Sequence, residues 1–126
     1  MIHLDTQVVI WLSAKRWSQF SRPALRLIEK LDHIVISPNV LVEIEILIEI
    51  QRIRATSAWS VYETLNLDMG LELSSSSVAD VARKACTFAW TRDPFDRLIV
   101  ANAMADGARL ITADQRILQN FKDAVW

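Results

Sequence analysis

The sequence of 126 residues contains little glycine or proline, 2 and 3 residues respectively, and a single cysteine, Cys86. So few glycines and prolines argue against a disordered or loop-rich chain. One cysteine excludes an internal disulfide, and we expect Cys86 to be a small buried residue in a cytoplasmic, reducing environment. Apolar runs such as 98–101 are far too short to span a bilayer, so we expect no membrane segment. The N-terminus lacks a basic region followed by an apolar signal core, so we expect no export signal.

The net charge of −1 provides no overall basic field, so composition alone does not indicate a nucleic-acid partner. Hydrophobic residues make up 52% of the chain, which is enough for a substantial core. This fraction also suggests that some apolar surface is kept for a partner. The length fits a single domain covering residues 1–126.

Segments with the patterns of strands and helices alternate along the chain. The expected strands are 2–5, 33–36, 71–73, 109–112 and 123–126. The expected helices are 6–14, 23 to about Leu31, 38 to about Arg54, 57 to about Leu67, 77–89, 94–105 and a short one from 115. This alternation predicts an α/β fold with a parallel sheet covered by helices on both faces. In such folds, ligands bind beyond the carboxyl ends of the strands.

Four carboxylates occur just after expected strands or early in the helices that follow: Asp5, Glu43, Asp96 and Asp114. Asp5 and Asp114 each have a simple structural explanation as a turn or helix-capping residue, and this explanation is favoured when either is taken alone. Asp96 is balanced between function and a capping box with Asp93 as the N-cap.

Glu43 lies in the middle of the helix expected from Pro38. At helical spacing it falls on an apolar stripe with Ile46 and Ile50, while Arg52 falls on the solvated face. An unpaired carboxylate in such a stripe is costly. Glu43 is therefore either paired with an internal partner or directed into a functional crevice.

The four acids together favour a metal site more strongly than any one of them does. Four carboxylates at one edge of a sheet would repel each other without a cation, and oxygen donors select Mg²⁺ or Mn²⁺. Such an ion can activate water for attack on a phosphodiester. His3 and His33 stand at strand starts, and we expect them to be structural.

Four segments resemble, in order, the motifs of the PIN-domain family, and most closely those of VapC-type toxins of toxin–antitoxin pairs. These segments are 2–6, 36–44, 92–99 (which includes the run from Asp93 to Arg97) and 110–114. The resemblance covers essentially the whole chain. It implies a three-layer α/β/α PIN-like fold, Mg²⁺- or Mn²⁺-dependent endoribonuclease activity, a homodimer and an inhibitory antitoxin.

By position, the resemblance assigns catalytic and metal-binding roles to Asp5, Glu43 and Asp96, with Asp114 as a less constant fourth acid. Supporting hydroxyls are expected at two further positions, Thr6 and Thr112. An alternative is a non-catalytic PIN-like scaffold that binds RNA or protein. A phosphatase of the haloacid type is disfavoured, because no second acid stands two residues after Asp5.

Basic residues flank the acidic motifs at Lys15, Arg16, Arg92, Arg97 and Arg116. We expect Arg92 and Arg97 to be the better candidates for contacts with RNA phosphates. Four aromatic residues either pack in the core or form a groove for an antitoxin helix or a dimer patch. They are Trp17, Phe20, Trp59 and Tyr62.

Overall fold

The computed structural model describes residues 1–30 and 33–126. Within them, five strands form one all-parallel sheet in the order β3-β2-β1-β4-β5. The strands are β1 (Ile2–Leu4), β2 (Ile34–Ile36), β3 (Glu72–Leu73), β4 (Arg109–Ile111) and β5 (Ala124–Val125). The predicted parallel sheet is confirmed, with β3 as the expected edge strand.

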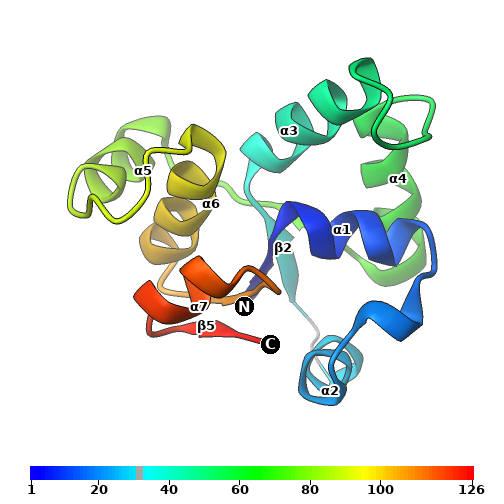
Figure 1. The fold of residues 1–126 in the computed structure, drawn as a ribbon, viewed down its shortest axis with the longest axis horizontal. Helices are drawn as coiled ribbons and strands as arrows, with labels where there is room; N and C mark the ends of the chain where they lie inside the picture. The colour runs from blue at the N-terminus through cyan, green and yellow to red at the C-terminus, as the bar shows by residue number, and fades with distance from the viewer. Residues whose placement is uncertain (31–32) are drawn as a thin grey trace.

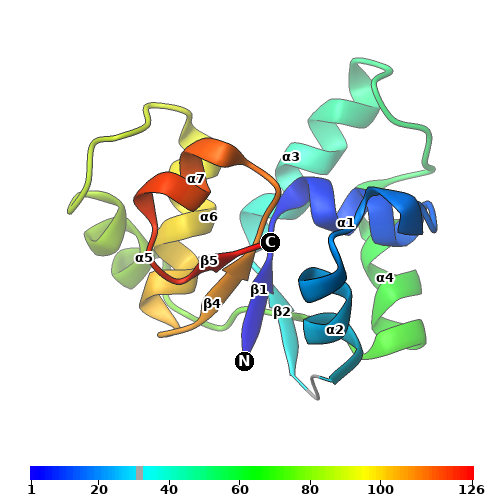
Figure 2. The ribbon, with the colours of Figure 1, turned by 60° about the horizontal axis from the view of Figure 1, so that its bottom comes forward.

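Helices cover both faces of this sheet, as Figures 1 and 2 show. On one side lie α1 (Thr6–Ser13), the 3₁₀ helix η1 (Trp17–Gln19), α2 (Arg22–Lys30), α3 (Pro38–Glu49) and α4 (Ala58–Met69). On the other lie α5 (Val78–Ala85), α6 (Pro94–Ala105) and α7 (Gln115–Asn120). The three-layer α/β/α prediction is confirmed. The end expected for the second helix at Leu31 lies outside the described residues.

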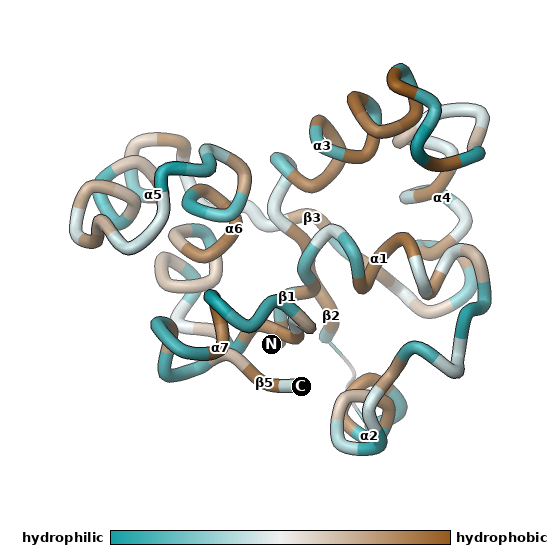
Figure 3. Tube along the Cα trace, viewed as in Figure 1, coloured by the Kyte–Doolittle hydropathy of each residue, from teal (hydrophilic) through white to brown (hydrophobic). Residues whose placement is uncertain are grey.

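The inner strands β1, β2 and β4 are largely buried and are rich in large aliphatic residues. The side chains of β1 and β2 are buried throughout, and Leu4, Ile36 and Leu110 are fully inaccessible. Figure 3 shows hydrophobic residues on these inner strands. Parallel strands buried on both faces need such continuous apolar runs. None of the helices in the described ranges is long and apolar enough to cross a membrane.

Two helices end earlier than the sequence pattern predicts. Helix α3 stops at Glu49 because Gln51 adopts a left-handed backbone with φ of 60°, and α5 stops at Ala85. The expectation that Cys86 is buried is wrong, because its thiol is exposed. Cys86 follows Ala85, which turns toward the core together with Val81, so the next position along the helix faces solvent.

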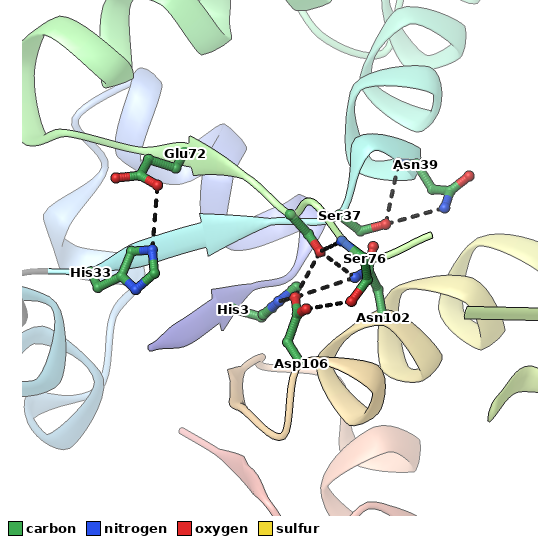
Figure 4. Close-up of polar contacts among 9 residues, drawn as sticks. His3, His33, Ser37, Asn39, Glu72, Ser76, Asn102 and Asp106 are labelled. Carbon is green, nitrogen blue, oxygen red and sulfur yellow. Dashed lines mark hydrogen bonds and ion pairs between the residues drawn. The ribbon is translucent and has the colours of Figure 1, made fainter. Parts of the chain in front are cut away.

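A partly buried polar cluster ties β1 and the segment after β3 to the end of α6 (Figure 4). The carboxylate of Asp106 accepts hydrogen bonds from His3 Nε2 at 2.6 Å, Ser74 Oγ at 2.7 Å and Ser76 Oγ at 2.5 Å. Burial lowers the pKa of His3, which outweighs the opposing effect of Asp106. This shift favours the uncharged imidazole, and the hydrogen bond to Asp106 gives His3 the structural role expected of it.

Replacing Asp106 by alanine should destabilise the protein by about 3 kcal/mol, because it leaves the donors of His3, Ser74 and Ser76 without their shared acceptor. The measurement is urea unfolding followed by circular dichroism. The matched control is Asp123→Ala, which removes an exposed carboxylate and should change the stability by less than about 0.5 kcal/mol. Equal effects of the two substitutions would contradict this role for the cluster.

Candidate metal centre

A pocket of about 300 Å³ lies at the carboxyl ends of β1 and β4, where the order of the strands reverses. Among the described residues, its lining includes no basic side chain. It is formed by the four predicted acids together with polar and apolar neighbours: Asp5, Thr6, Gln7, Ile10, Glu43, Leu47, Asp96, Ala113 and Asp114. The fold therefore brings together four carboxylates that are distant in the sequence.

Asp5 joins the end of β1 to the start of α1. One carboxylate oxygen caps the helix by accepting from the backbone N–H of Thr6 at 2.8 Å. The other accepts from the Oγ1 hydroxyl of Thr112, beyond β4, at 2.6 Å. Asp5 thus has a structural role as an N-cap, and the hydroxyl of Thr112 holds its carboxylate across the reversal in strand order.

Glu43 extends from the second turn of α3 toward the start of α1. Its Oε2 atom accepts from the hydroxyl of Thr6 at 2.5 Å, and the residue is half-buried. The expected apolar stripe around Glu43 is wrong in part, because Ile46 and Ile50 are 39% and 55% exposed. The side of α3 that faces inward is instead the side of Val40 and Ile44, since only this side meets the core.

Asp96 lies in the first turn of α6 and is half-buried. A capping box would require Asp96 to accept from the backbone N–H of Asp93, but that group donates to the hydroxyl of Thr91 at 3.2 Å. Asp93 is itself the N-cap and accepts from the N–H groups of Phe95 and Asp96. Capping therefore accounts for Asp93 and leaves the carboxylate of Asp96 directed to the pocket.

Asp114 is the most exposed of the four acids. It caps α7 by accepting from the backbone N–H of Ile117 at 3.0 Å, and its own N–H donates to Thr112 Oγ1 at 3.0 Å. The hydroxyl of Thr112 therefore contacts both Asp5 and Asp114. Asp114 is therefore a helix-capping residue, as its sequence context indicated. Its carboxylate is also the fourth one in the lining of the pocket.

The acids of the pocket destabilise one another's charged forms. Desolvation and the nearby carboxylates of Asp93, Asp5, Asp114 and Glu43 raise the pKa of Asp96 to about 7. Burial is also the main reason that the pKa of Asp5 is raised, against the hydrogen bonds from Thr112 and Thr6, and it raises the pKa of Glu43. A bound cation would relieve this repulsion.

The donor set fits a hard divalent ion. All four ionisable groups of the pocket are carboxylates, and oxygen donors suit Mg²⁺ or Mn²⁺ better than zinc. In the described part of the chain, no group of three or more acidic, histidine or cysteine side chains is arranged so that it could hold a metal ion. Mg²⁺ characteristically takes few protein ligands and keeps several waters.

The two arginines proposed for RNA contacts lie in different environments. Arg92 is exposed just before α6, and its contact with phosphate stays a prediction. The guanidinium of Arg97 donates to the backbone carbonyls of Ala85 and Phe88 and lies over the Phe88 ring. These contacts anchor the connection between α5 and α6, and they do not favour the predicted phosphate contact for Arg97.

The sequence reasoning overlooked Gln7 and the apolar residues Ile10 and Leu47, which also line the pocket. Gln7 directly follows the motif of Asp5 and Thr6 and is exposed in the first turn of α1. Its place beside the first acid was visible in the sequence. The parts played by Ile10 and Leu47 depend on how α1 packs against α3.

A model of the PIN domain family matches residues 2–123, and the chain therefore belongs to that family. PIN domains are typically nucleases, which agrees with an acidic pocket at the strand-order reversal. No curated protein sequence matches the chain.

Two solved structures are similar in fold. A VapBC2 complex from Rickettsia felis, bound to a DNA fragment from its promoter, matches with a TM-score of 0.61 and 19% identity over 94% of this chain and 92% of that chain. A toxin–antitoxin complex from Klebsiella pneumoniae matches with a TM-score of 0.66 and 16% identity over 100% of this chain and 97% of that chain.

The metal-free protein should lose stability as the pH rises through about 7. An unfolded aspartate has a pKa of about 3.9, so folded Asp96, with its pKa raised to about 7, binds its proton more tightly than the unfolded chain does. This stabilising contribution is complete below a pH of about 4 and is lost as Asp96 ionises in the folded state. Thermal denaturation in EDTA between about pH 5 and pH 8 measures it.

The substitution Asp96→Asn should flatten this dependence, and Asp123→Asn, at an exposed position, should leave it unchanged. Adding Mg²⁺ at about pH 8 should raise the Tm of the unaltered chain more than that of Asp96→Asn. A pH profile unaffected by Asp96→Asn would contradict the assignment of the raised pKa.

Proposed function

We propose that the protein is a metal-dependent endoribonuclease and the toxin of a toxin–antitoxin pair, acting in the cytoplasm. The observation that carries the proposal is the meeting of Asp5, Glu43, Asp96 and Asp114 in one pocket without a basic residue among its described lining. Membership of the PIN domain family and the likeness in fold to toxin–antitoxin complexes support it.

The four carboxylates would hold Mg²⁺ or Mn²⁺, with Asp114 as the most exposed ligand. When bound, such an ion lowers the pKa of water and neutralises charge on the phosphodiester. The chain itself orients the ligands. Thr6 directs Glu43 and Thr112 directs Asp5 through hydrogen bonds of 2.5 and 2.6 Å.

The free pocket also has a place for a proton. With a pKa of about 7, the carboxyl group of Asp96 is poised to hold or release a proton near neutral pH. Gln7, exposed beside Asp5, can donate its amide hydrogens to a phosphate oxygen of the substrate. The half-buried apolar side chains of Ile10 and Leu47 restrict water on the side of the pocket formed by α1 and α3.

An apolar groove on the opposite side of α1 fits an antitoxin helix. It has a volume of about 500 Å³ and lies among α1, η1, α2 and α4, with Leu12, Trp17, Leu25, Ile28 and Met69 in its lining. Trp17 is 51% exposed, as a partner contact requires, whereas Phe20 is only 9% exposed and packs against Trp11 and Trp126. A helix docking its apolar side in a groove is a common mode of peptide recognition.

The homodimer would use the exposed side of α3. Val42, Ile46 and Ile50 recur every fourth residue and are 52%, 39% and 55% exposed, so they form one apolar stripe. Figure 3 shows hydrophobic residues along α3. A self-complementary patch of this kind can be buried against a second copy related by two-fold symmetry.

The nuclease proposal is tested by incubating a mixed RNA pool with the protein in Mn²⁺, in Mg²⁺ and in EDTA. Cleavage should require the ion, and Asp5→Asn should abolish it because a ligand is lost. Thr6→Val should reduce the rate about 10- to 100-fold, since it removes only the hydroxyl that orients Glu43.

Asp123→Asn is the matched control and should cleave at the rate of the unaltered chain. Cutting that persists in EDTA or in Asp5→Asn would refute the metal mechanism. Metal-independent RNA binding with no cleavage under any condition would favour the alternative, a non-catalytic PIN-like scaffold.

The dimer proposal predicts that Ile46→Asp weakens self-association at least about tenfold, because a charge would be buried in the apolar stripe. Sedimentation equilibrium over a range of protein concentrations measures the dissociation constant. Leu67→Asp, on α4 at a position 85% exposed, is the control and should leave association unchanged. A monomeric unaltered chain, or equal effects of both substitutions, would overturn the proposal.

A further inference from the structure

A second groove, of about 670 Å³, adjoins the acidic pocket. The two share three lining residues, Gln7, Ile10 and Leu47, so they meet along the side chains of α1 and α3. Their charges are opposite. The acidic pocket has four carboxylates, whereas the adjoining groove is lined by the arginines Arg16 and Arg52, together with Arg54.

These arginines are available to a ligand. All three are exposed, and within residues 1–30 and 33–126 none of them takes part in an ion pair. The described lining of the groove includes no carboxylate. Three uncompensated positive charges in one groove are notable in a chain whose net charge is −1, because the rest of the surface provides no general attraction for an anion.

The backbone holds two of these arginines in matching positions. At the end of α1, Lys15 has a left-handed backbone with φ of 54°, and the N–H of Arg16 donates to the carbonyl of Trp11. At the end of α3, Gln51 has φ of 60°, and the N–H of Arg52 donates to the carbonyl of Leu47. Both ends follow the Schellman pattern.

This repeated pattern preorganises the basic groove. Non-glycine residues seldom adopt the left-handed conformation, so its use at two neighbouring helix ends reflects a backbone held by its surroundings. Each motif places an arginine directly after the turn. Because α1 and α3 start at the carboxyl ends of the parallel strands β1 and β2, both arginines follow the helix ends that lie away from Asp5 and the start of α3.

From this arrangement we infer that the groove holding Arg16, Arg52 and Arg54 binds phosphates of single-stranded RNA a few nucleotides from the bond that is cut. The inference rests on the proposed nuclease function and names where its substrate lies. The strand would run from the acidic pocket past Gln7, across the apolar floor of Ile10 and Leu47, to the arginines. Apolar side chains can cover base and sugar faces while cations contact the backbone.

An acidic segment of a partner protein could also be attracted to three arginines. RNA is favoured because the groove adjoins the acidic pocket, where a scissile phosphodiester would have to lie. A substrate strand occupies both sites at once. An acidic peptide has no phosphodiester to place in the acidic pocket, so that pocket would add nothing to its binding.

The test is fluorescence anisotropy with a labelled, unstructured oligouridylate in EDTA, at several salt concentrations. Replacing Arg16 and Arg52 together with glutamine should weaken binding about tenfold or more. It should also lower the slope of log K against log salt by about 1.4, since each phosphate contact with a single strand contributes about 0.7. The same pair changed to lysine should retain most of the slope.

The matched control is Arg22→Gln with Arg26→Gln, which removes the same charge from exposed positions on α2. This pair should bind oligouridylate as the unaltered chain does. Equal losses from both double variants would mean that only overall charge matters and would overturn the inference. A second result would also overturn it. If the groove variant binds RNA normally but has lost affinity for oligoglutamate, the groove is a protein-docking site.

The failure of this inference is distinguishable from failure of the nuclease proposal. If cleavage depends on metal but the salt slope of the groove variant is unchanged, the groove does not bind RNA and the nuclease proposal stands. If no cleavage is seen but the salt slope of the groove variant is reduced, the nuclease proposal fails and the groove is still an RNA-binding site.

Discussion

Electrostatic repulsion among carboxylates is the constraint on which the functional part of this structure depends. Desolvation and four neighbouring acids raise the pKa of Asp96 to about 7, so the free pocket is a costly arrangement near neutral pH. The chain maintains it with two threonine hydroxyls, from Thr6 and Thr112, which donate to Glu43 and Asp5. These bonds join α1 to α3 and β1 to β4, and they make the geometry of the pocket part of the fold.

Several residues of the pocket serve structure and chemistry together. Asp5 caps α1 with one oxygen and accepts from Thr112 with the other, while Asp114 caps α7. Capping and metal binding are compatible because a carboxylate has two oxygens and several lone pairs. The structural and functional explanations of such an acid are therefore not exclusive, although they compete when the sequence is considered one residue at a time.

The two grooves along α1 differ in chemical character. The groove toward α2 and α4 is apolar and includes Leu12 and Trp17, whereas the groove toward α3 includes Arg16 and Arg52. One short helix thus separates a surface suited to an apolar partner from one suited to an anionic strand. A protein bound in the first groove would lie close to the second, which offers a physical route by which a partner could limit access to the acidic pocket.

Local sequence patterns are enough to predict the alternation of strands and helices, the parallel sheet and the four acids near strand ends, because periodicity and capping are local properties. They misjudged Cys86, Ile46 and Ile50, whose exposure depends on which side of a helix meets a neighbour. The three-dimensional arrangement was needed to find that the N–H of Asp93 donates to Thr91 and that Arg16 and Arg52 line one groove. These contacts join segments through packing, and the spacing of residues along one chain carries no information about the packing of α1 against α3.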